Sequence, residues 1–259
     1  MLGHQIKVEF DRILNGKQIV KWLLLIFVFP TIQFLLIKDN YVYYRHLDFF
    51  LRLNSNFVPL LFPILMTLVY TTEYVGEQKN NFIQYTRLRI PLSTYLLSKL
   101  ITNAILSFII AFFIVFIPFI FAMYVEPVLG IVKLSPTEGN PIPYTTFEQF
   151  LFLGTFPYGI IYSLWVGLNG SMYATMALLF LMILEKPFIA LSIPFIYYLM
   201  TNYITQVLDL DRFSPASTIF PFSIDQQPLW TVFVPFSILF LILVILVFYL
   251  KETMYKRYV

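Results

Sequence analysis

Six long stretches without a charged residue constrain the fold of this chain more than any other feature. Short charged segments separate them, and they cover residues 22–37, 53–72, 100–125, 149–184, 187–208 and 226–250. A helix needs about 20 mainly apolar residues to cross a hydrocarbon core of about 30 Å. A soluble domain of 259 residues would not carry six such stretches, so the sequence predicts an all-α, polytopic membrane protein.

The composition supports the same fold class. Only 12% of the residues are charged and 59% are hydrophobic, whereas soluble proteins contain about 25% charged residues. The segments between the apolar stretches are too short to hold a nucleotide-binding, kinase or sensor domain. The chain is therefore expected to form a single transmembrane domain over residues 1–259.

The distribution of charge predicts the topology. The N-terminus, residues 73–99, the turn at 185–186 and the C-terminal tail together carry 12 Lys/Arg and 6 Asp/Glu, and the remaining loops carry 5 and 8. Short loops rich in Lys and Arg stay in the cytoplasm. We therefore expect a multi-pass protein of the cell membrane with both termini cytoplasmic.

The fourth apolar stretch is the one whose crossing number is ambiguous. Its 36 residues would form a helix of about 54 Å, which is too long for one crossing and tight for two. Two crossings would place the basic C-terminus outside, against the charge rule. We therefore expect an interfacial helix at 145–156, a break at Pro157 and a single span beyond it.

The predicted elements follow from these arguments. Residues 2–14 are amphipathic and form either an interfacial helix or an ordinary helical lead-in to the first span. The apolar face of that helix holds Leu2, Ile6, Phe10, Ile13 and Leu14, and the opposite face largely holds Lys7, Glu9, Asp11 and Arg12. The six spans are expected at about 20–37, 55–74, 100–124, 158–184, 188–207 and 229–250.

The sequence lacks the groups that intramembrane chemistry requires. It has no cysteine, and its two histidines, His4 and His46, fall on opposite sides of the membrane in this topology. It has no H-E-x-x-H, G-x-S-x-G or P-loop motif, and no acidic or basic residue at a span centre to bind a coupling ion. We expect no catalytic site, no metal and no cofactor in this chain, so any uphill transport must draw its energy from another subunit.

Small residues mark one face of the fourth span. Gly167, Gly170, Ser171 and Ala174 follow the i, i+3, i+4, i+7 spacing of a helix face. Such faces let helix backbones approach closely in lipid. We expect a helix-packing contact here, either within the chain or between two copies.

The segment between the second and third spans is the most distinctive polar region. Glu73 and Glu77 end the second span, Phe82 and Tyr85 follow three residues apart, and Arg87 comes next. A short helix with these side chains could dock in a groove of a partner protein. The alternative interpretation is a positively charged loop whose aromatic side chains rest on the membrane.

This layout resembles the permease subunit of bacterial ABC-2-type transporters. The resemblance covers nearly the whole chain in layout and is motif-like only in residues 73–99. There, Glu73 or Glu77, Gly76, Phe82 to Tyr85, Pro91-Leu92-Ser93 and Lys99 follow the family's order. The family's usual Thr/Ser-Pro pair is Ile90-Pro91 in this chain.

The resemblance implies a coupling helix at about residues 76–90 that contacts a separate ABC ATPase. The residues that it assigns to this contact are Glu73, Glu77, Asn80, Phe82, Tyr85 and Arg87. The implied partners are an ATPase dimer, which would hold ATP and magnesium, a second permease copy or a paralogous permease, and membrane lipid; no nucleic acid is expected.

The implied activity is export of an amphipathic peptide, antibiotic or lipid along spans 1, 2 and 5. The alternative is a non-transporting immunity or assembly protein that binds a peptide or protein partner in the membrane. A passive channel is a third hypothesis, but the sequence has no ring of charged or polar residues that would favour it.

Overall fold

The fold is all-α, as the apolar stretches predict. The computed structural model describes residues 1–80, 89–135, 144–184, 186–222 and 224–258, without the side chains of residues 254–258. In these ranges it contains no β-strand, and six helices are long and apolar enough to span a membrane. These helices are α2 (Gly16–Ile37), α4 (Phe57–Lys79), α6 (Leu92–Ile120), α8 (Thr155–Ile183), α9 (Pro187–Val207) and α11 (Trp230–Tyr258).

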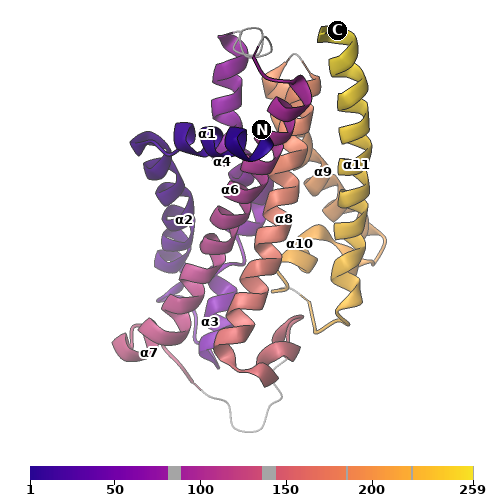
Figure 1. Ribbon diagram of the computed structural model, residues 1–259. Coiled ribbons are helices and arrows are strands. Elements are labelled where there is room, and N and C mark those ends of the chain that lie inside the picture. Colours follow the sequence, from indigo (N-terminus) through magenta and orange to yellow (C-terminus); the bar gives the residue numbers. More distant parts are fainter. Residues whose placement is uncertain (81–88, 136–143, 185, 223, 259) are drawn as a thin grey trace.

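Both chain termini lie at one end of the helix bundle (Figure 1). The C-terminal end of α4 and the N-terminal end of α6 lie at the same end, and we call it the termini end. The opposite end, here the far end, carries short elements between the spans. They are α3 (His46–Leu53), η1 (Phe121–Val125), α7 (Glu126–Leu129) and η2 (Glu148–Leu153), whereas η3 (Asp211–Phe213) and α10 (Pro215–Ile219) connect α9 to α11, with α10 about half-way along the bundle (Figure 1).

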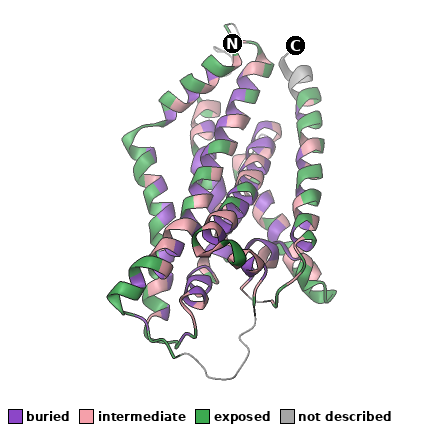
Figure 2. Ribbon diagram, turned by 60° about the horizontal axis from the view of Figure 1, so that its bottom comes forward, coloured by how far each residue is buried: buried purple, intermediate pink, exposed green. Residues whose placement is uncertain are grey.

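Helix α8 forms the centre of the bundle. Within its most apolar window 72% of the residues are buried, whereas the corresponding value for α9 is 17%. Figure 2 shows this contrast between the buried central helices and the exposed faces of the outer ones. Close packing of α8 depends on glycine: a Cβ at Gly170 would lie 2.5 Å from the Cβ of Ala111 on α6.

The fourth apolar stretch breaks at a different residue from the one expected. A 3₁₀ helix, η2, occupies Glu148–Leu153, and Gly154 then adopts a φ of +106° before α8 begins. Glycine reaches this conformation without a Cβ clash. Pro157 lies in the first turn of α8, where its missing N–H costs nothing, so the direction changes at Gly154 and not at Pro157.

Two spans extend further toward the termini end than the apolar stretches indicate. Helix α4 continues to Lys79 and α6 begins at Leu92, whereas the stretches predicted limits at 74 and 100. Both extensions are polar. They place Glu73, Glu77 and Lys99 on helices and not in a loop.

At the far end, polar contacts to the buried carboxylates Glu126 and Glu148 connect the loops. Helix α3 lies within the predicted loop 38–56, and Arg45, at its N-cap, contacts Glu148 at 2.8 Å. Burial opposes the charge on Arg45, but hydrogen bonds to Asp48 and Glu148 outweigh burial and raise its pKa. His46 lies 3.1 Å from Glu126. Helix α3 is therefore linked to both η2 and α7 at this end of the bundle.

Helix α1 (Leu2–Ile13) lies across the bundle at the termini end (Figure 1). Its buried residues are Gln5, Glu9 and Ile13. The predicted apolar face is only partly covered, since Phe10 is half-buried and Leu14 is 54% exposed. The helix therefore turns a largely polar side toward the spans.

Substitution of Gly159 tests the packing of α8 against α6. A Cβ on Gly159 would overlap the ring of Phe119, which is fully buried. Overpacking of this kind costs about 1–3 kcal/mol, so Gly159→Ala should lower the thermal stability of the purified protein in detergent. The matched control is Gly76→Ala on α4, where a Cβ would meet no atom within 4 Å and removal of a helical glycine should stabilise by about 0.5–1 kcal/mol. Equal melting temperatures for the two variants would contradict this account.

Candidate functional site

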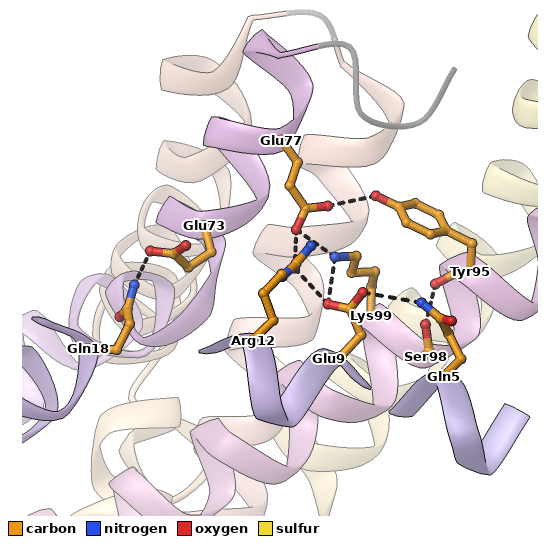
Figure 3. Close-up of polar contacts among 9 residues, drawn as sticks. All are labelled: Gln5, Glu9, Arg12, Gln18, Glu73, Glu77, Tyr95, Ser98 and Lys99. Carbon is orange, nitrogen blue, oxygen red and sulfur yellow. Dashed lines mark hydrogen bonds and ion pairs between the residues drawn. The ribbon is translucent and has the colours of Figure 1, made fainter. Parts of the chain in front are cut away.

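Four charged side chains from three helices meet at the termini end (Figure 3). They are Glu9 and Arg12 of α1, Glu77 of α4 and Lys99 of α6, and we call them the charge junction. The Lys99 Nζ lies 2.6 Å from a carboxylate oxygen of Glu9 and 2.6 Å from one of Glu77. The two acids and two bases balance in formal charge.

Lys99 is the most deeply placed member of the charge junction. Its side chain has no exposed surface, and Glu9 and Glu77 are 2% and 10% exposed. An isolated charge at such a position would be strongly unfavourable, because burial removes its hydration. Ionisable residues in transmembrane segments accordingly pair with one another. Lys99 can therefore be tolerated inside α6 only while α1 and α4 supply their carboxylates.

Arg12 closes the charge junction at its more exposed side. Its guanidinium contacts both carboxylates, with Nη2 2.6 Å from Glu9 and also paired with Glu77. Burial by itself would lower the pKa of Arg12, but the charges of Glu77 and Glu9 more than offset burial, and the pKa is raised. The side chain therefore stays cationic at every physiological pH.

Neutral side chains complete the hydrogen bonding around the carboxylates. The hydroxyl of Tyr95 donates to Glu77 at 2.7 Å, and the amide of Gln5 donates to Glu9 at 3.5 Å. Gln78, one residue after Glu77, donates to the backbone carbonyl of Leu181 at 2.9 Å. The last turns of α4 thereby contact α1, α6 and the end of α8.

A second set of contacts holds α2 against α4. The amide of Gln18 donates to Glu73, Lys21 donates to Thr72 at 2.9 Å, and the indole of Trp22 donates to the carbonyl of Val69 at 3.0 Å. The contact between Gln18 and Glu73 lies next to the charge junction along α4 (Figure 3). The two helices at the N-terminus are thus both fixed to the end of α4.

The arrangement is suited to holding helices together. Every charge in it contacts an opposite charge within the chain. Among the described residues, no group of three or more His, Cys, Asp or Glu side chains could hold a metal ion. The junction therefore fixes the geometry on either side of the α4–α6 connection.

The residues predicted to contact a partner fall into two groups. Glu73 and Glu77 are on α4 and are engaged within the chain, and Asn80 is the C-cap of that helix, its N–H bonded to the carbonyl of Gly76. The other three, Phe82, Tyr85 and Arg87, lie outside the described residues. The two carboxylates are thus placed to support the connection rather than to reach out from it.

The predicted small-residue face of α8 lies largely within the chain. Gly170 approaches Ala111 of α6, and a Cβ at Gly167 would lie 3.0 Å from the ring of Phe108. Ala174 is fully buried, whereas Ser171 is partly exposed and donates to the carbonyl of Leu168.

The sequence did not predict that Glu9, Arg12 and Lys99 belong to one site. Glu9 and Arg12 have the i, i+3 spacing of a helical ion pair, which is the one local signal. Their partners follow only much later in the chain, so their meeting depends on the packing of three helices.

Comparisons with protein-family models, with curated proteins and with solved structures find no match to this chain.

Substitution of Lys99 tests the charge junction. Lys99→Met leaves Glu9 and Glu77 buried with one base fewer, and breaking a buried pair costs about 3–5 kcal/mol. We expect a large loss of thermal stability in detergent. Neutralising one acid as well, in the double variant Glu9→Gln/Lys99→Met, leaves Glu77 paired with Arg12 and should recover a substantial part of that loss.

The matched control is Lys21→Met, because Lys21 lies at the same end of the bundle but makes an exposed hydrogen bond to Thr72. Its loss should change stability by less than about 1 kcal/mol. If Lys99→Met were as mild as Lys21→Met, the charge junction would not hold the helices.

Proposed function

We propose that this chain is the membrane permease subunit of an ATP-driven exporter, coupled to a separate ATPase through the connection between α4 and α6. The ATPase would be a cytoplasmic dimer that binds ATP and magnesium, and the permease would act with a second copy or a paralogue. In this proposal the termini end faces the cytoplasm, as the excess of Lys and Arg there favours.

The observation that carries the proposal is the way in which the connection is anchored. Glu77 lies two residues before the end of α4, and Lys99 lies in the second turn of α6. Their contact and the contacts of both with Glu9 tie the two ends of the connection to each other and to α1. A force applied to residues 80–91 would therefore act on three helices together.

The neighbourhood of the connection also offers space for a partner. A cavity of about 400 Å³ lies between the start of α1 and the start of α6, lined by Met1, His4, Gln5, Ile90, Pro91 and Thr94. Its lining includes the last residues of the connection, so a protein that docks on the connection would cover this cavity.

An amphipathic cargo fits the surface of the spans better than a strongly ionic one. A hollow of about 240 Å³ between α2 and α6 is lined almost entirely by apolar side chains, among them Ile26, Pro30, Phe34, Pro118 and Phe121. Such a lining suits an acyl chain or the apolar side chains of a peptide. Peptides, antibiotics and lipids remain the proposed cargo.

The test is purification of the tagged chain from its native membranes in mild detergent, with mass spectrometry of the proteins that accompany it. We expect a near-stoichiometric soluble protein with a P-loop. The double variant Phe82→Ala/Tyr85→Ala should abolish the recovery of the P-loop protein, since these aromatics are the proposed apolar anchors. It should also abolish the stimulation of that protein's ATP hydrolysis by the permease. Insertion of the permease in the membrane should be unchanged.

The control variant is Phe188→Ala. Phe188 is an 84% exposed aromatic in the first turn of α9, outside the connection, and its loss should leave the ATPase bound. If only this chain or membrane proteins without a P-loop are recovered in several detergents, the exporter lacks an energy source. The non-transporting immunity or assembly protein would then be the better proposal.

A further inference from the structure

A stripe of polar side chains continues from the charge junction into the bundle along α6. Asn103 and Ser107 follow Lys99 at i+4 and i+8 and so lie on the same helix face, and Thr102 lies beside them. We call Thr102, Asn103 and Ser107 the polar stripe, and all three side chains are fully buried. Ser107 lies about 22 Å along α6 from its first residue, which is well inside a span.

None of these side chains makes a hydrogen bond with a described residue. The atoms without a partner are the Oγ1 of Thr102, the Oγ of Ser107 and both amide atoms of Asn103. The hydroxyl of Tyr70 on α4 is also buried without a hydrogen bond.

Several other polar side chains in the spans are satisfied locally, although the hydroxyls of Tyr158, Ser163 and Tyr198 are also buried without a partner among the described residues. The hydroxyls of Thr71 and Thr175 donate to the carbonyl four residues earlier, and the amide of Asn169 does the same to Trp165 at 3.0 Å. This local bond is the usual way for a span to satisfy such groups. Thr102, Asn103 and Ser107 do not use it, so the groups on this face of α6 are available to another partner.

Four unsatisfied polar atoms on one buried helix face are unfavourable in a membrane, because neither lipid nor apolar side chains can supply the missing hydrogen bonds. Apolar residues of similar size would pack the same space without that penalty. A polar network that is only partly satisfied is worse than an apolar core. These residues therefore indicate a ligand that supplies hydrogen bonds.

We propose that the polar stripe is a binding site for neutral hydrogen-bonding groups, reached from the termini end beneath α1. Amide and hydroxyl side chains offer both donors and acceptors but no charge, and the nearby charges of the junction are already balanced. The ligand is either water or a neutral amide or hydroxyl group of the cargo. The charge junction, with Glu9 of α1 seated on Lys99, closes this access.

The inference does not depend on the ATPase, because it concerns the isolated chain. The test uses the absence of cysteine from the sequence. Ser107→Cys and Thr102→Cys place a single thiol on the polar stripe, and Leu106→Cys is the matched control. Leu106 is buried and lies next to Ser107 at the same depth, but its side chain is apolar.

The measurement is the rate at which a small methanethiosulfonate modifies each thiol in lipid nanodiscs, followed by intact-mass spectrometry. The reaction requires the thiolate, which apolar burial suppresses, so the rate reports access of water. We expect the two stripe thiols to react about tenfold faster than Leu106→Cys. Asn103→Leu should remove most of this difference, since it makes the face apolar.

A second arm separates the two ligand sources. Adding Glu9→Gln/Arg12→Gln to Ser107→Cys loosens α1 from the junction. If the thiol of Ser107→Cys already reacts fast with the junction intact, the ligand is water in the resting protein. If its rate rises about tenfold only when Glu9→Gln/Arg12→Gln is added, the site is one that opens for cargo.

Equal rates for Ser107→Cys and Leu106→Cys, with the junction intact and with it loosened, would overturn the proposal. So would a stripe thiol whose rate is unaffected by Asn103→Leu. The exporter proposal would survive either result, because its own test is the recovery of an ATPase.

Discussion

The contact of the Lys99 ammonium with two carboxylates is the interaction on which the termini end of this protein depends. It joins α1 to α6 and α6 to α4 through one buried cation. Helix α1 is short and precedes the first span, so its apolar residues alone would let it lie anywhere along the membrane interface. Pairing of Glu9 with Lys99 selects one position of α1, because in any other position the buried ammonium of Lys99 would have one carboxylate fewer to balance its charge.

A buried group of charges is a poor way to increase stability, since the loss of hydration offsets much of the attraction. A well-packed apolar contact would hold three helices at least as firmly. What charges add is specificity: only one register of α1 brings Glu9 to Lys99 and Arg12 to Glu77 together. This register fixes both ends of the α4–α6 connection, and such precision matters if a partner acts on that connection.

The sequence predicted the number of spans and the fold class, because lack of charge over a membrane's thickness leaves few alternatives. It failed where polar residues extend a helix. The predicted span limits at 74 and 100 leave out Glu77 and Lys99, since charge usually marks the end of a span, yet each is compensated by a partner on another helix. Glu9 belongs to the predicted polar face of α1, but it turns inward beside Gln5 and Ile13, whereas Lys7 and Asp11 of that face are exposed. The break at Gly154 was missed because proline is the more familiar interruption, although only glycine adopts its φ without strain.

Helix α6 unites the two polar features of the bundle. Its first turns carry Tyr95 and Lys99 at the charge junction, and the next two turns carry the polar stripe. An α-helix moves as a rigid element over this length, so a displacement that draws Lys99 from Glu9 must also shift Asn103 and Ser107 against their neighbours. Once Lys99 and Glu9 are apart, each of these charges has lost a partner. Water or another polar group must then solvate them near α6. The polar stripe has no hydrogen-bond partners while Glu9 contacts Lys99, but it can line that hydrated space when the two are apart. This role would account for polar side chains at buried positions of α6.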